Sequence, residues 1–143
     1  MQMDAGITEA GEGINGMTWN ILGQIYVPKQ VCESSFSWHA TLPPGTFVPP
    51  HIHPKQDEFI HMLSGRLDFL LDGKTASAGV GDFVRLPMGI PHGIYNNSDA
   101  PVTCLFWVSP TGKLFDLFQK INNIPDPQEV IRLSGLHDVP FLP

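Results

Sequence analysis

The chain has 143 residues, enough for one domain that buries its own core without disulfide or metal staples. It is 42% hydrophobic and 15% charged, with a formal net charge of −6 and no lysine or arginine cluster, which excludes a typical nucleic-acid partner. No apolar run reaches membrane-spanning length, and the acidic, glycine-rich start at residues 1–16 differs from a signal peptide. We interpret Cys32 and Cys104 as buried free thiols rather than a disulfide, and we expect a cytoplasmic chain without a membrane partner.

Short apolar runs separated by turn residues follow one another through the first two thirds of the chain. Phe36–Leu42 alternates strictly between apolar and polar residues, and Asp72–Gly73 is a strong two-residue hairpin signal. About eight strands without an intervening helix predict an all-β antiparallel sandwich or barrel. The expected strands are Phe36–Leu42, Thr46–His53, Glu58–Leu63, Arg66–Leu71, Ala76–Ala78, Phe83–Leu86, His92–Asn96 and Val102–Ser109, with Ile21–Val27 as an additional edge strand.

The tail has a different pattern. Apolar residues at helical spacing predict a helix over Lys113–Ile121. A second short helix is expected to begin with Asp126 as its N-cap and Pro127 at its first position, and to end at Gly135. The last residues, Val139–Pro143, are apolar and are expected to pack on the barrel or on a neighbouring subunit.

Three histidines and one glutamate are the candidate metal ligands. His51 and His53 are two residues apart, so an extended strand presents both imidazoles on one face. Glu58 follows the predicted turn at residues 54–57, and His92 comes from a later glycine- and proline-rich run. This mixed nitrogen and oxygen set suits one divalent transition metal, with iron, manganese, nickel, cobalt, copper and zinc all compatible. The alternative is that these side chains are polar barrel residues bonded to one another.

The spacing of these residues closely resembles the two motifs of the cupin superfamily. The first motif is matched by Gly45, His51, His53, Glu58 and Gly65, and the second by Gly81, Pro87, Gly89, His92 and Asn96. The motif match covers about residues 42–97, and the strand pattern extends it to about 20–110. The resemblance implies a cupin β-sandwich, or jelly-roll barrel, in one domain over residues 1–143. The barrel core would lie at about 20–110 and the helical tail at about 111–143.

The resemblance also carries expectations about chemistry and assembly. The tail is loosely similar to that of small quercetinase-like cupins, the flavonol dioxygenases, in which the glutamate matching Glu58 is the proposed catalytic base. Small cupins usually form homodimers, so a homodimer is expected here. For Glu58, a role as ligand alone and a role as ligand plus base stay equally open.

The pocket wall is predicted from strand parity. Ile60 and Met62 share the parity of Glu58, Phe47 shares that of the two histidines, and Phe69 is a further candidate. Such a lining suits a flat or apolar small-molecule substrate, although each of these residues can equally belong to the core.

Three other histidines are interpreted as lying outside the site. His61 is three residues after Glu58 and so has the opposite parity, whereas His39 and His137 are interpreted as surface residues.

The function predicted from these features is a metal-dependent oxidoreductase, a dioxygenase acting on a small enolic or phenolic substrate. Two alternatives remain open: a lyase or isomerase that uses the metal as a Lewis acid, and a non-catalytic cupin that binds a small molecule.

Overall fold

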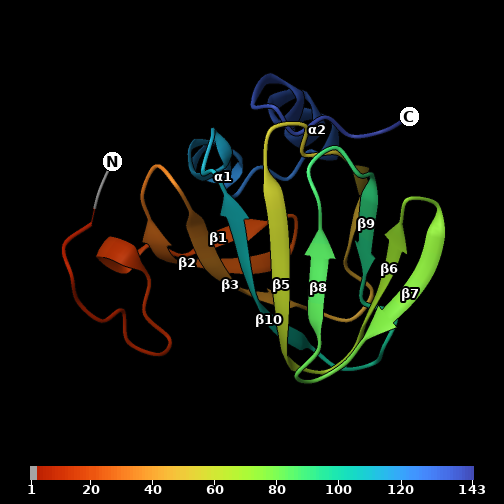
Figure 1. Cartoon of the computed structure of the whole chain (residues 1–143), viewed down its shortest axis with the longest axis horizontal. Coiled ribbons are helices and arrows are strands. Elements are labelled where there is room, and N and C mark those ends of the chain that lie inside the picture. Colours follow the sequence, from red (N-terminus) through yellow and green to blue (C-terminus); the bar gives the residue numbers. More distant parts are fainter. Residues whose placement is uncertain (1–2) are drawn as a thin grey trace.

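Two antiparallel sheets face each other and enclose the core of the molecule. The computed structural model describes residues 3–143. The strands are β1 (Trp19–Ile21), β2 (Gln24–Val31), β3 (Phe36–Leu42), β4 (Phe47–His51), β5 (Asp57–Ser64), β6 (Leu67–Leu71), β7 (Lys74–Ala78), β8 (Phe83–Leu86), β9 (His92–Tyr95) and β10 (Val102–Ser109). One sheet has the order β1-β2-β3-β10-β5-β8 and the other β4-β9-β6-β7 (Figure 1). The predicted all-β antiparallel sandwich is confirmed.

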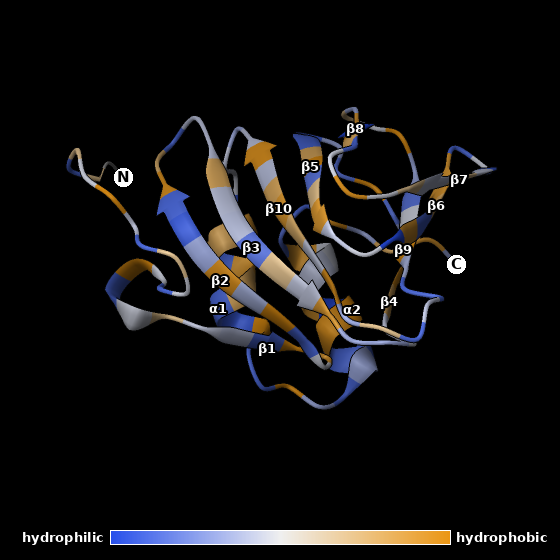
Figure 2. Ribbon diagram, turned by 90° about the horizontal axis from the view of Figure 1, so that it is seen from below, coloured by the Kyte–Doolittle hydropathy of each residue, from blue (hydrophilic) through white to orange (hydrophobic). Residues whose placement is uncertain are grey.

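The six-stranded sheet forms because its strands alternate between apolar and polar residues. In β3, Phe36, Trp38, Ala40 and Leu42 are buried, whereas the residues between them are half-buried on the outer face. The neighbouring strands β10 and β5 also alternate between buried and more exposed residues, in register with β3. The three strands lie side by side in the sheet (Figure 2). The inward residues of these strands therefore supply one continuous apolar wall.

Tight turns close the hairpins. Between β6 and β7, Asp72 and Gly73 have φ values of 50° and 80°. Two successive left-handed residues are what a type I′ hairpin turn requires, so the turn predicted from Asp-Gly is confirmed. Asn96 holds the chain before β10, since its Nδ2 donates to the carbonyls of Leu42 and Ala100 at 2.8 and 2.9 Å.

The predicted edge strand at Ile21–Val27 is wrong in its boundaries. Leu22 and Gly23 adopt φ values of 49° and 91°, and the Asn20 side chain accepts a hydrogen bond from the Gly23 N–H. This turn divides the segment into β1 and β2. β2 then pairs with β3 as well as with β1, so β1 is the edge strand.

The tail contributes two helices, α1 (Leu114–Ile121) and α2 (Pro127–Leu136), which lie together over one end of the barrel (Figure 1). Asp126 is the N-cap of α2, as predicted, because its Oδ1 accepts a hydrogen bond from the Gln128 N–H. The helix ends one residue beyond Gly135. Among the described residues, neither helix has the length and apolar character needed to cross a membrane.

An aromatic cluster joins α1 to the six-stranded sheet. Trp38 stacks on Phe36 and on Phe106 at ring-centroid distances of 4.8 and 5.2 Å. From α1, Phe118 meets Trp38 edge-on at 5.1 Å, and Phe115 meets Phe36 at 5.3 Å. Edge-to-face and offset arrangements are favourable for aromatic rings, so this cluster fixes α1 over the end of the barrel.

The last residues pack on the barrel itself, one of the two alternatives expected. The Ile52 N–H donates to the Pro140 carbonyl at 3.1 Å, and the Leu142 N–H donates to the Pro50 carbonyl at 2.9 Å. Phe141 thus lies opposite His51, at the free edge of β4.

Candidate metal centre

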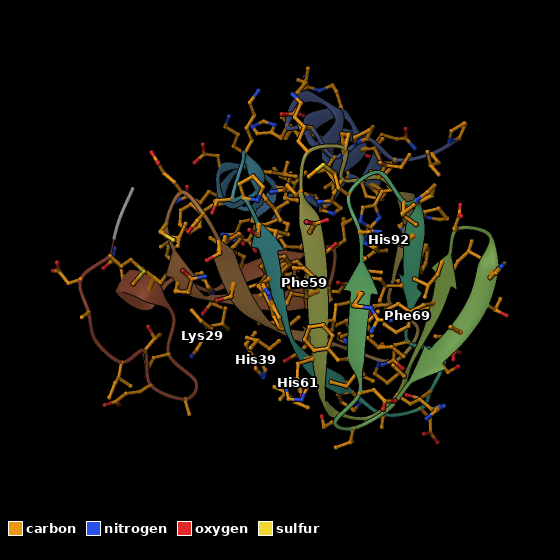
Figure 3. All side chains as sticks on the ribbon, viewed as in Figure 1. Lys29, His39, Phe59, His61, Phe69 and His92 are labelled. Atoms are coloured by element: carbon orange, nitrogen blue, oxygen red, sulfur yellow. The ribbon has the colours of Figure 1, made fainter. Side chains whose placement is uncertain are left out.

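The four predicted ligands converge in the barrel interior. His51 ends β4 and faces His92, the first residue of β9, as its direct partner in the four-stranded sheet. His53 lies two residues beyond the end of β4, and Glu58 comes from β5 in the opposite sheet. Figure 3 shows His92 near the helical end of the barrel. Ligands from both sheets therefore meet inside one cavity.

The donor atoms are close enough to share one ion. One ligand atom from each of His51, His53, Glu58 and His92 lies within 4.8 Å of all the others, and the four residues are at most 4% exposed. Glu58 Oε2 lies 3.1 Å from His53 Nε2 and 3.0 Å from His92 Nε2. Such burial makes any charge here expensive unless it is paired.

The second nitrogen of each imidazole is held by an oxygen acceptor. Nδ1 of His51 lies 2.8 Å from the Pro49 carbonyl, and Nδ1 of His92 lies 3.2 Å from the Ile90 carbonyl. Nδ1 of His53 lies 2.8 Å from Gln56 Oε1. Because these oxygens only accept, each Nδ1 carries the proton, and a neutral ring then leaves Nε2 free as a ligand.

Gln56 is a functional residue that the sequence reasoning missed. Its Nε2 donates to the Pro110 and Thr111 carbonyls at 3.0 and 2.7 Å, which turns its Oε1 towards His53. It is 5% exposed, and it lies two residues before Glu58. A polar residue at that parity in the motif is the signal that could have identified it.

Burial and the neighbouring ligands shift the pKa values of three of the four ligands. Burial alone would raise the pKa of Glu58, but His53 and His92 outweigh it and hold the pKa of Glu58 well below its ordinary value. Burial likewise opposes the charged form of His53, yet Glu58 outweighs it and raises the pKa of His53. Burial, with His92 and His53 adding to it, lowers the pKa of His51 to about 3.

These donors fit a divalent cation. Two lone pairs of neutral imidazoles directed at one carboxylate oxygen are repulsive unless a positive charge lies between them. A proton relieves one pair, whereas a metal ion relieves all of them at once. Three imidazole nitrogens and a carboxylate oxygen are ligands that first-row transition metals accept.

Three of the ligands, His51, His53 and Glu58, line a cavity of about 90 Å³ to which α1, α2 and the C-terminal residues also contribute. Apart from His51, His53 and Glu58, most of the lining is apolar or aromatic. The Tyr26 hydroxyl donates to Gln24 Oε1 at 2.7 Å, and burial, followed by Glu58 and Cys104, raises the pKa of Tyr26. Within residues 3–143, the indole Nε1 of Trp38 is the one buried side-chain polar atom without a partner, so an oxygen acceptor from a bound molecule would offset a cost of about 1–3 kcal/mol.

The four residues predicted for the pocket wall lie in different places. Phe47 lines the cavity, although its side chain is 56% exposed at the molecular surface. Ile60, Met62 and Phe69 point inward, as parity predicts, but they are buried in the hydrophobic core and are not among the residues that line the cavity. The wall comes instead from β2, β3, β4, β9 and β10, the two helices and Phe141, and much of it lies outside the motifs in sequence.

The other histidines and the cysteines lie outside the ligand cluster. His39 and His61 project from the outer face of the six-stranded sheet (Figure 3). His137, expected at the surface, is buried, because its Nδ1 donates to the Leu133 carbonyl and its Nε2 accepts from Lys120. Both cysteines are free, but Cys32 is only half-buried, which corrects the prediction of two buried thiols.

Comparison with known proteins agrees with the fold. Residues 38–108 match the Cupin_2 family, described as a cupin domain. The chain superposes on an RmlC-like cupin from Shewanella frigidimarina with a TM-score of 0.70 and 16% identity, over 80% of this chain and 99% of that one. At this identity the likeness shows a shared fold.

Two curated relatives align with the barrel. Polyketide synthase CurC of Streptomyces cyaneus is 31% identical over 77 residues, which are 54% of this chain and 50% of that protein. Quercetin 2,3-dioxygenase of Bacillus subtilis is 32% identical over 85 residues, which are 59% of this chain and 25% of that protein. The aligned part thus spans about half of the first relative and a quarter of the second.

Proposed function

Because this chain contains a cupin domain of the Cupin_2 family, we propose that it is a metal-dependent oxidoreductase, a dioxygenase acting on a small enolic or phenolic substrate. The observation that carries the proposal is the convergence of three imidazoles and one carboxylate in a buried, mainly apolar cavity. The similarity to quercetin 2,3-dioxygenase supports the choice of reaction.

The four ligands suit an ion that still has room for a substrate. With four protein donors, a six-coordinate ion keeps about two positions open. A bound redox-active metal supplies Lewis acidity and an electronic partner for dioxygen. The apolar lining excludes water and favours an organic ligand whose oxygens face the ligands.

Glu58 is the residue we assign to proton transfer. Of the described residues that line the cavity, it is the sole carboxylate, so it is the group able to take a proton from a substrate hydroxyl there. Removing a hydroxyl proton makes an enol or phenol electron-rich, which prepares it for oxidation. The lowered pKa of Glu58 keeps this group as a carboxylate, which is the form that accepts a proton.

Oxygen uptake tests the proposal. Protein loaded in turn with iron(II), manganese, nickel, cobalt and copper is mixed with a panel of enols and phenols in an oxygen electrode. We expect uptake with at least one metal and substrate, and loss of uptake in Glu58→Gln at equal metal content. Undiminished conversion under nitrogen would contradict the proposal and favour a lyase or isomerase, and binding without turnover across the panel would favour a binding protein.

A further inference from the structure

An open groove of about 690 Å³ lies on the outside of the metal cavity. It is bordered by the β1–β2 turn, β4, the α1–α2 connection and the start of α2, with side chains that include Leu22, Phe47, Ile124 and Ile131. No charged residue is among the described residues that line it, and Asn20, Thr46 and Asn123 are its polar side chains. The groove therefore suits an apolar group rather than a phosphate or a carboxylate.

The groove and the metal cavity share one wall. Leu22, Phe47, Pro49, Val130 and Phe141 line both spaces. Of these five, Pro49 and Phe141 also contact a ligand: the Pro49 carbonyl lies 2.8 Å from His51 Nδ1, and the ring of Phe141 lies 5.3 Å from the ring of His51. The partition between the groove and the metal site therefore includes a side chain from the C-terminal segment.

Volume decides whether the cavity alone can hold a substrate. A dry cavity of roughly 150 Å³ is known to accept benzene, and organic ligands usually occupy sites of roughly 300–1,000 Å³. The cavity, at about 90 Å³, falls short of one ring, whereas the groove, at about 690 Å³, lies inside that range. A substrate that reaches the ligands must therefore displace part of the wall.

Few bonds attach the C-terminal segment to the rest of the wall. Two backbone hydrogen bonds, Ile52 N–H to Pro140 and Leu142 N–H to Pro50, tie it to the edge of β4. The nearby ion pair between Lys55 and Asp138, at 3.3 Å, is solvent-exposed and so contributes little. Phe47 and Pro49 belong to β4 and Val130 belongs to α2, whereas Leu22 lies in the β1–β2 turn.

We propose that the groove and the metal cavity are two compartments of one substrate site, joined when Phe141 moves aside. This inference rests on the proposed metal-dependent function and adds the substrate class. The ligand is an elongated, mainly apolar molecule with chelating oxygens at one end and a second ring or chain beyond them. The oxygens face His51, His53 and Glu58, and the apolar part lies in the groove against Ile131.

Two probes with the same chelating group test the compartments. Catechol and 4-phenylcatechol are titrated into cobalt(II)-loaded protein under nitrogen, and binding is followed by the visible absorption of cobalt. We expect 4-phenylcatechol to bind at least tenfold more tightly than catechol. Ile131→Glu places a charge in the groove. It should lower the affinity for 4-phenylcatechol at least tenfold and change the affinity for catechol by less than twofold.

The matched control is Leu136→Glu, an equally drastic change on the same helix at a residue that lines neither space. Its affinity for each probe should stay within twofold of the wild-type value. Equal affinity of the two probes for wild type, no binding of 4-phenylcatechol, or the same effect from both glutamate variants would overturn the inference.

Association rates test whether Phe141 separates the groove from the metal cavity. Phe141→Ala should speed the binding of both probes at least tenfold in stopped-flow mixing, whereas Leu142→Ala, in the same segment but outside both linings, should not. Unchanged rates in Phe141→Ala would show that the chain opens elsewhere. Cobalt content is measured first: its absence from wild type would overturn the metal site and this inference together. Probe binding without oxygen uptake in the earlier assay would overturn the dioxygenase alone.

Discussion

The barrel interior has two halves that are stabilised in different ways. In one half, Trp38, Phe36 and Phe106 stack on one another and on the rings of α1, and this packing is favourable without an ion. In the other half, His53, His92 and Glu58 direct lone pairs at one point, and only a cation makes that arrangement favourable. Apolar packing therefore stabilises the fold, whereas the ligand half becomes favourable when a metal ion binds.

Disrupting the aromatic half should have the largest effect on stability. Trp38 is 1% exposed, so Trp38→Ala leaves a cavity and should lower the free energy of unfolding by about 3–5 kcal/mol. Urea denaturation of the metal-free protein measures the loss. Phe83→Ala, at a ring that is 48% exposed on the outer sheet face, is the control and should cost less than about 1 kcal/mol. Equal costs would mean that the cluster is not the main source of stability.

Removing the hydrogen bond that orients His53 should lower the metal affinity, an effect of intermediate size. Gln56→Leu removes the acceptor from His53 Nδ1 at similar volume, so it should lower metal affinity by about 10–100-fold, as the loss of partners behind ligands typically does. Competition with a chelating dye measures the affinity. Gln119→Leu, at an exposed residue of α1, should leave it unchanged. An unaltered affinity in Gln56→Leu would show that His53 needs no such support.

Acidification should destabilise the metal-free protein through His51. Its pKa is about 3 in the fold against 6.5 in the unfolded chain, so between these values the unfolded state binds the extra proton. The free energy of unfolding should therefore fall, as pH drops below 6.5, by up to about 1.4 kcal/mol per pH unit. The lowered pKa of Glu58 makes the free energy of unfolding depend on pH only below 4.5, its unfolded value. The raised pKa of His53 makes it depend on pH only above 6.5.

Urea denaturation at about pH 6 and pH 5 isolates the His51 contribution. His51→Gln should remove most of the pH slope. His39→Gln should remove less, because partial burial, followed by Lys29, lowers the pKa of His39 at a more open position. A slope that persists in His51→Gln would show that this imidazole is not the group that resists protonation.

Local sequence patterns predicted most strands of the barrel and identified the four candidate ligands. Strict alternation determined β3, the Asp72–Gly73 pair determined the β6–β7 turn, and the motif spacing identified the histidines and Glu58. These features depend on neighbours in sequence, which is why the sequence alone reveals them. The homodimer and the role of Glu58 as a base stay predictions.

The features that sequence could not supply depend on distant segments. Ile60 and Met62 have the right parity, but which inward residues border the cavity depends on where α1, α2 and Phe141 cover the barrel. The turn at Leu22–Gly23 was missed because Leu22 rarely adopts a positive φ. Burial of His137 similarly depends on Lys120, from the other helix.

Metal content tests the central claim most directly. Untagged wild-type protein and His53→Ala are purified in parallel, and bound metals are measured by elemental analysis before and after reconstitution. We expect close to one transition-metal ion per chain in wild type and a loss of most of it in His53→Ala. Wild-type protein that holds no metal even after reconstitution, or a variant that holds as much as wild type, would contradict it.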